Sequence, residues 1–149
     1  MATYLGKLTA DMKTAMKGGD KPRLEVLRML ISDLKKKAID AKVDDLPDDE
    51  EVAVLQKAVK TRADTVAQAT AAGRNEVAAK EQFEIQVIQG YLPQQMSAAD
   101  VAAKVREVAA AIGYQGGKDT GRFMKEWMAR HKGLADGKAV QDALRSLGG

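Results

Sequence analysis

The chain has 149 residues, of which 45% are hydrophobic and 4% aromatic, and its formal net charge is +3. Because it has no cysteine and a single histidine, disulfides, thiolate nucleophiles, cysteine-ligated zinc and histidine-rich metal sites are excluded. No apolar run approaches the roughly 20 residues of a membrane-spanning helix, and residues 1–17 lack a signal-peptide core, so we expect a cytoplasmic protein without a membrane partner.

Apolar residues recur every three or four positions at the start of the chain and predict two amphipathic helices there. The pair Gly18-Gly19 separates the two helices. Asp20 is placed to cap the second helix, and Pro22 falls in its first turn, where a missing N–H costs nothing. The apolar stripes are Leu5, Leu8, Met12 and Met16 in the first helix, and Leu24, Leu27, Ile31, Leu34 and Ala38 in the second.

A turn at residues 44–47 leads to a long third helix and, beyond Gly73, to a fourth. The four acidic residues 48–51 open the third helix, where they complement the helix dipole; a metal site is the alternative interpretation of this cluster. The inward stripes are Val52, Leu55, Val59, Ala63, Val66 and Thr70 in the third helix, and Ala78, Ile85, Ile88 and Leu92 in the fourth. Residues 1–92 are therefore predicted to form an N-terminal domain of antiparallel helical hairpins with one shared core.

Pro93 interrupts the helical pattern, because the residue before a proline avoids the helical region. Beyond it, residues 93–149 predict a small module of three shorter helices. Residues 97–100 are close to a capping box at the start of the fifth helix, and Asp119 and Asp136 are placed to cap the sixth and the seventh. The inner faces are Val101, Val105, Val108 and Ile112 in the fifth helix, and Val140, Leu144 and Leu147 in the seventh.

The predicted fold class is therefore all-α, with a four-helix N-terminal part and a three-helix C-terminal module. The composition supports this prediction, because a chain rich in Ala, Lys, Glu and Gln and poor in aromatic residues favours helices over strands.

The sixth helix is predicted to have an apolar face and a basic face. At 100° per residue, one arc holds Phe123, Met124, Trp127, Met128 and His131, and a separate arc holds Arg122, Lys125, Ala129 and Lys132. A core helix with a solvated polar side is one interpretation; the other is a basic face that follows phosphates. Trp127 is expected in the core rather than stacked on a base, and His131 is expected to be partly buried near the helix end.

Basic residues are in excess in this C-terminal module. Residues 93–149 carry nine basic and six acidic residues, whereas residues 1–92 carry fifteen of each. Backbone amides near Gly121 and Gly137 are suited to bind anions, and Lys118, Lys132 and Lys138 stand beside them. Charge complementarity within the protein and an anionic partner are both compatible with this distribution.

Several segments together resemble the YqeY family, and the resemblance covers nearly the whole chain. The segments are residues 10–13, 23–30, 91–97, 119–125 and 132–140. The C-terminal module is also similar to the tail domain of GatB, a component of the tRNA-dependent amidotransferase. The chain departs from the pattern at Thr120 and Arg122, where many family members have Met and Lys; Arg122 keeps the positive charge.

The resemblance implies a module that contacts the outer corner of tRNA, alone or beside an aminoacylation or amidotransferase complex. The module residues that match the family pattern are Gly121, Arg122, Met124, Lys132, Gly133, Ala135, Asp136, Gly137 and Val140. The glycines and Asp136 are interpreted as structural, for tight turns and a cap. The residues predicted to contact nucleic acid are the basic ones Lys118, Arg122, Lys125, Lys132 and Lys138.

The sequence lacks the groups that amide transfer needs. No cysteine is present, and Ser32, Ser97 and Ser146 lie outside the sequence patterns of activated serines. Neither a P-loop nor a Rossmann fingerprint is present to bind ATP or another nucleotide. The resemblance by itself would imply the activity of a carbon–nitrogen ligase with glutamine as amide donor.

The residues instead predict a helical module without catalytic residues, cofactor or metal. The resemblance implies that this module binds tRNA or is accessory to tRNA-dependent amidation without carrying the chemistry. The alternative is a helical protein–protein adaptor with no nucleic-acid role. A monomer is favoured.

Overall fold

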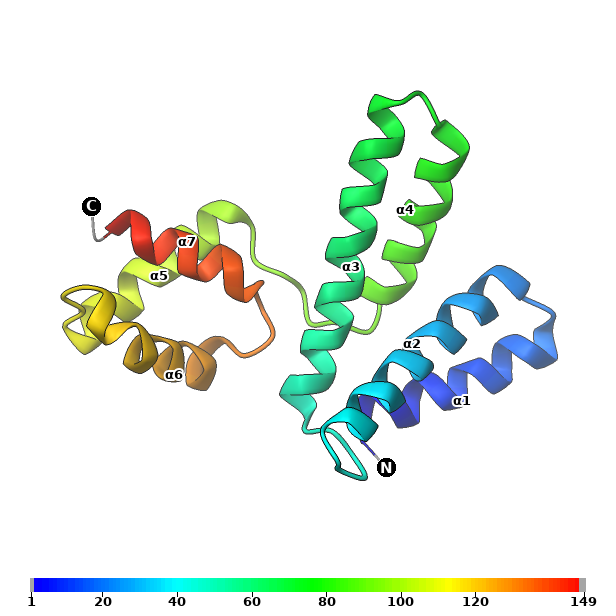
Figure 1. Cartoon of the computed structure of the whole chain (residues 1–149), viewed down its shortest axis with the longest axis horizontal. Coiled ribbons are helices and arrows are strands. Elements are labelled where there is room, and N and C mark those ends of the chain that lie inside the picture. Colours follow the sequence, from blue (N-terminus) through cyan, green and yellow to red (C-terminus); the bar gives the residue numbers. More distant parts are fainter. Residues whose placement is uncertain (1, 148–149) are drawn as a thin grey trace. The chain divides into compact units, whose positions relative to one another are not determined.

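The computed structural model of the chain describes residues 2–147, which form seven α-helices and one short 3-10 helix without any β-strand (Figure 1). The predicted all-α fold class is therefore confirmed. The chain divides into two compact units, residues 1–92 and residues 93–149.

The N-terminal unit consists of two helical hairpins. Helix α1 packs against α2, and α3 packs against α4, while α2 also contacts both α3 and α4. The helices are α1 (Thr3–Gly18), α2 (Lys21–Asp40), α3 (Asp48–Ala71) and α4 (Asn75–Gln89). The two hairpins share one core, in which the fully buried side chains are Leu8, Leu27, Leu30, Leu34, Leu55 and Ile88.

Local signals set the ends of these helices as predicted. Asp20 caps α2, because its carboxylate accepts a hydrogen bond from the Arg23 N–H at 3.3 Å. Gly19 and Gly73 follow α1 and α3 in the left-handed conformation, with φ of 70° and 72°, which glycine adopts at little cost.

The predicted inward stripe of α3 is right at its start and partly wrong further along. Val52 and Leu55 are buried and Val59 packs against the core, but Ala63 and Thr70 are exposed. The buried positions beyond Leu55 are instead Ala58, Arg62 and Ala69. The apolar pattern misplaced the stripe because α3 packs against α4 through small alanines and a charged residue, which hydrophobic periodicity does not count. Two other predicted inward residues, Met16 and Leu147, lie in the last turns of their helices and are 50% and 41% exposed.

The C-terminal unit has α5 at its centre, with α6 and α7 packed against it. Its elements are α5 (Ala98–Ile112), a 3-10 helix η1 (Gly117–Asp119), α6 (Thr120–His131) and α7 (Gly137–Leu147). Ser97 caps α5 as predicted, because its hydroxyl accepts a hydrogen bond from the Asp100 N–H at 3.1 Å. The fully buried side chains are Val105, Val108, Phe123, Trp127, Val140 and Leu144.

The prediction that the Asp119 side chain caps α6 is wrong. Its carboxylate accepts a hydrogen bond from the Gln115 N–H at 2.9 Å and pairs with the Arg122 guanidinium at 3.3 Å. The reason is that η1 runs directly into α6, so Asp119 has φ −95° and ψ 1° rather than the extended conformation of an N-cap. Its side chain therefore closes the preceding loop instead.

The segment between Pro93 and α5 is bound to the loop between α6 and α7. The Gln95 side-chain amide donates hydrogen bonds to the carbonyls of Pro93 at 2.8 Å and Gly133 at 2.7 Å. The Met96 N–H donates to the Leu134 carbonyl at 2.7 Å. The first residues of the C-terminal unit are thus part of its folded structure rather than a loose connection.

Candidate functional site

All five basic residues predicted to contact nucleic acid are exposed in the C-terminal unit. Lys118 lies in η1, Arg122 and Lys125 lie in α6, Lys132 follows the last residue of α6, and Lys138 lies in the first turn of α7. Arg122 and Lys125 are three residues apart and share one face of α6. The five residues thus come from three elements and the α6–α7 loop, and only this pair lies together on one helix.

Ion pairing distinguishes Arg122 from the four lysines. The Arg122 guanidinium lies 3.3 Å from the Asp119 carboxylate, at a site where the arginine side chain is 55% exposed. Within residues 2–147, none of Lys118, Lys125 and Lys132 forms an ion pair, and neither does Lys138. The lysine charges are therefore available to bind an external anion. Arg122 would first have to leave the Asp119 carboxylate before it could bind such an anion.

The other basic residues of this unit are mostly neutralised within their own helices. The pairs are Lys104 with Glu107, Arg130 with Glu126 and Arg145 with Asp142. Such exposed pairs contribute little to stability. Their consequence for binding is that they reduce the local positive charge at Lys104, Arg130 and Arg145.

Trp127 lies in the core of the C-terminal unit, as predicted. It is 2% exposed, its ring stacks on Phe123 with centroids 6.1 Å apart, and its centroid lies 4.7 Å from that of the half-buried His131 ring. Trp127 therefore has no face available to stack on a base. Met128, predicted on the same apolar arc, is 40% exposed instead.

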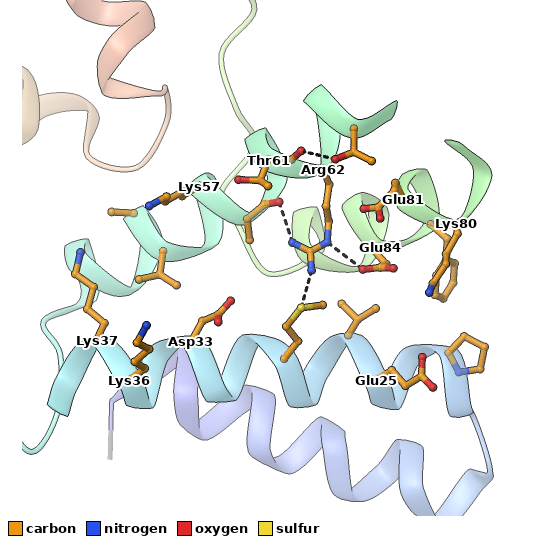
Figure 2. A pocket seen from close by; sticks show the side chains of 18 of the residues that line it. Glu25, Asp33, Lys36, Lys37, Lys57, Thr61, Arg62, Lys80, Glu81 and Glu84 are labelled. Atoms are coloured by element: carbon orange, nitrogen blue, oxygen red, sulfur yellow. Dashed lines mark hydrogen bonds and ion pairs between the residues drawn. The ribbon is translucent and has the colours of Figure 1, made fainter. Parts of the chain in front are cut away.

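A groove of the N-terminal unit was not found from the sequence. It has a volume of about 1040 Å³ and lies between α2 on one side and α3 and α4 on the other (Figure 2). Its lining includes the apolar side chains of Val26, Met29, Ala58 and Phe83. Five basic and five acidic side chains also line it.

A buried ion pair stands in the wall of this groove. Arg62 is 8% exposed, and its Nε donates a hydrogen bond to Glu84 at 3.1 Å. The same guanidinium donates through Nη1 to the Ala58 carbonyl at 3.0 Å and through Nη2 to the Met29 sulfur at 3.2 Å. One side chain of α3 thus connects to α4 and α2 (Figure 2). Its spacing from Leu55 and Ala58 was the available sequence signal, because 55, 58 and 62 follow one helical face.

The acidic start of α3 has a structural role that the sequence did not reveal. Glu51 is fully buried, and its carboxylate accepts hydrogen bonds from the backbone N–H groups of Leu5 at 2.9 Å and Tyr4 at 3.3 Å. It therefore caps the first turn of α1 from a different helix. In the described residues, no group of three or more histidine, aspartate or glutamate side chains is arranged to hold a metal ion.

The pKa of the Glu51 carboxyl is raised above its ordinary value. Burial is the main cause, the charges of Asp48 and Asp45 add to the rise, and the two backbone hydrogen bonds oppose it. A raised pKa in the folded state means that the folded protein holds this proton more tightly than the unfolded chain does. The contribution to stability is therefore present below the unfolded pKa and is lost as the pH rises through the folded pKa.

We expect this dependence to disappear in the Glu51→Gln variant, whose side chain keeps an acceptor oxygen but does not titrate. The free energy of unfolding of the wild type, relative to the variant, should fall as the pH rises from about 4.5 towards 7. Urea denaturation at a series of pH values measures this difference in the free energy of unfolding. Glu76→Gln, an exposed residue in the first turn of α4, is the control for the general effect of removing a carboxylate. Parallel pH curves for wild type and Glu51→Gln would contradict the expectation.

Tyr91 closes the N-terminal unit just before Pro93. Its hydroxyl donates a hydrogen bond to the Asp11 carboxylate at 2.6 Å, and the Lys7 ammonium lies 5.4 Å from its ring centroid. Burial, together with the hydrogen bond to Asp11, raises the pKa of Tyr91 to about 12. Two segments that carry the family resemblance, residues 10–13 and 91–97, thus meet through one hydrogen bond.

The described part of the chain contains no helix with the length and apolar character that crossing a membrane requires.

Comparison with known proteins identifies the family. A relative is the protein of Lachancea thermotolerans named "Altered inheritance of mitochondria protein 41, mitochondrial", which is 32% identical over 110 residues. The match covers 72% of this chain and 59% of that protein, so the chain spans less than two thirds of its relative's length. That relative is named as mitochondrial, and the cytoplasmic location expected for this chain stays a prediction.

The family model described as "Yqey-like protein" matches residues 5–147, which include both helical units. The resemblance seen in the sequence is therefore confirmed, and the chain belongs to the YqeY-like protein family.

Proposed function

We propose that the C-terminal unit binds tRNA through the phosphate backbone and assists tRNA-dependent amidation without carrying the chemistry. The observation that carries the proposal is the set of four exposed lysines, Lys118, Lys125, Lys132 and Lys138, that have no ion pair with any described residue. Lysines available in this way can displace counterions from nucleic acid. The resemblance of this unit to the tail domain of GatB supports tRNA as the form of nucleic acid.

The proposal assigns no base-specific contact. Phosphate contacts position a protein on nucleic acid but carry no sequence information, and Trp127, which would be suited to stack on a base, is buried. We therefore expect binding that depends steeply on salt and weakly on RNA sequence. Recognition of tRNA by this unit would rest on the shape of the folded RNA.

Replacing Lys125 or Lys132 by alanine should weaken tRNA binding, and each replacement should reduce the slope of log K against log salt by about one unit. Arg122→Ala should have a smaller effect, because the arginine must first leave Asp119. Asp119→Asn should strengthen binding, since it frees Arg122 and keeps an oxygen that can accept from the Gln115 N–H. Titrations of tRNA at several salt concentrations measure these effects.

The control is Lys13→Ala, an exposed lysine of α1 in the other unit. The alanine variants of the exposed lysines and of Arg122 should fold normally, because exposed substitutions usually change stability by no more than about 0.5 kcal/mol. If the wild type does not bind tRNA at low salt, or if Lys13→Ala weakens binding as much as Lys125→Ala, the proposal is wrong. The protein–protein adaptor predicted as the alternative would then remain.

A further inference from the structure

We propose that the groove of the N-terminal unit binds an amphipathic helix of another protein, and that this helix carries acidic residues near one end and basic residues near the other. The groove lies in residues 22–84, so the inference is independent of RNA binding by the C-terminal unit. It concerns a second interaction surface on the same chain.

The length of the groove suits an elongated partner. On the α2 side its lining runs from Pro22 to Ala41, and the intervening lining residues recur every three or four positions along one face of the helix. Nineteen steps of 1.5 Å give about 28 Å for this wall. The opposite wall is formed by α3 and α4 (Figure 2). A helix of about five turns matches this length, whereas a compact small molecule would leave most of the groove empty.

The groove offers apolar surface for the buried face of such a helix. Met29 and Phe83 are large apolar side chains that remain 41% and 39% exposed, and both line the groove. Methionine is well suited to a binding surface, because its flexible thioether adapts to different side chains. An apolar channel between helices is the usual receptor for an amphipathic helix.

The charges are ordered along the groove. Lys36, Lys37 and Lys57 gather at one end, where they outnumber Asp33 and Asp40. Glu25 and Glu81 lie towards the other end, where they outnumber Lys80 (Figure 2). Within the described residues none of the three lysines forms an ion pair. A partner helix with acidic residues at the lysine end complements this order.

The same charges argue against nucleic acid as the occupant. Acidic and basic side chains of the lining are equal in number, so a phosphate chain laid along the groove would meet as many carboxylates as lysines. A helix with separated charges meets a net opposite charge at both ends. The groove therefore fits a peptide better than a polyanion.

The experiment uses two designed 18-residue helical peptides with one amino-acid composition and the same leucine face. In the first, the glutamates lie in the N-terminal turns and the lysines in the C-terminal turns, as the peptide's own helix dipole favours; in the second, they alternate along the polar face. Fluorescence anisotropy with the full-length protein measures both affinities. We expect the first peptide to bind about tenfold more tightly, because several rim ion pairs each contribute a modest amount.

The variant Lys36→Glu/Lys57→Glu should remove this preference, while Lys13→Glu/Lys17→Glu, on α1 and outside the groove, should keep it. If the charge reversal unfolds the protein, Lys36→Gln/Lys57→Gln gives the same test with a smaller change. Methyl NMR of the methionines provides a second measurement, in which the Met29 signal should move on addition of the first peptide and the Met128 signal in the other unit should not.

Equal binding of the two peptides, an unchanged preference in the lysine variants or an unmoved Met29 signal would overturn the proposal. Competition between tRNA and the first peptide that Lys36→Glu/Lys57→Glu abolishes would also overturn it, because the groove would then be a nucleic-acid surface.

Discussion

Trp127→Ala should unfold the C-terminal unit under conditions in which the N-terminal unit remains folded. Truncation of a fully buried tryptophan lowers the free energy of unfolding by about 3–5 kcal/mol. The substitution also removes the stacking on Phe123 and the contact with His131. A unit of about 57 residues has a total stability of roughly 3–9 kcal/mol. The loss is therefore comparable with the whole stability of the unit.

Circular dichroism and calorimetry should show this as a low-temperature transition that wild type lacks, followed by the normal transition of the N-terminal unit. Trp127→Phe is the matched control, because it keeps an aromatic ring in the core and should cost clearly less. Trp127 is the only tryptophan of the chain, so its fluorescence in wild type reports the unfolding of this unit alone. A single unchanged transition in Trp127→Ala would show that its burial contributes little.

The second large effect is expected at the buried pair of the N-terminal unit. Arg62→Met should destabilise the protein by about 3–5 kcal/mol, because it leaves the Glu84 carboxylate without its partner in a site where both side chains are only 10% exposed. The double variant Arg62→Met/Glu84→Leu should recover most of the loss, since an apolar pair of similar size is often neutral or stabilising relative to a buried ion pair.

Urea denaturation of wild type, both single variants and the double variant gives the coupling energy between the two positions. The exposed pair Arg130–Glu126 of α6 is the control, because its two single replacements should each cost about 1 kcal/mol or less. A double Arg62→Met/Glu84→Leu variant as unstable as the sum of its single variants would contradict the expectation. The loss would then come from packing rather than from the unpaired charge.

The sequence predicted helices well because their signals are local. The caps Asp20 and Ser97 and the glycines that follow α1 and α3 depend on residues within a turn or two of one another. The apolar face of α6 that places Trp127 in the core is also recognisable from nearby residues. Spacing and residue type are enough to recognise such features. The predicted Asp119 cap is wrong because η1 precedes α6 directly. The formation of η1 depends on backbone geometry that the residue types around it do not specify.

The features that the sequence did not predict depend on pairs of residues far apart in the chain. Glu51 contacts Leu5 and Tyr4 across 46 and 47 positions, and Arg62 contacts Glu84 across 22 and Met29 across 33. A charged residue in a helix is interpreted as exposed unless its partner is known. The groove was missed for the same reason, because it exists only where α2 lies beside the other hairpin. The five basic residues of the C-terminal unit are exposed as a binding role requires, and that role stays a prediction.

The hydrogen bonds of Gln95 and Met96 have a consequence for any attempt to separate or exchange the two units. Helix α5 begins at Ala98, but the bonds to the Gly133 and Leu134 carbonyls come from residues before it. A C-terminal fragment that begins at Ala98 would lose the hydrogen bonds that hold the α6–α7 loop in place. The transferable piece therefore begins at Pro93, and a fusion that grafts this unit onto another protein should carry its five leading residues with it.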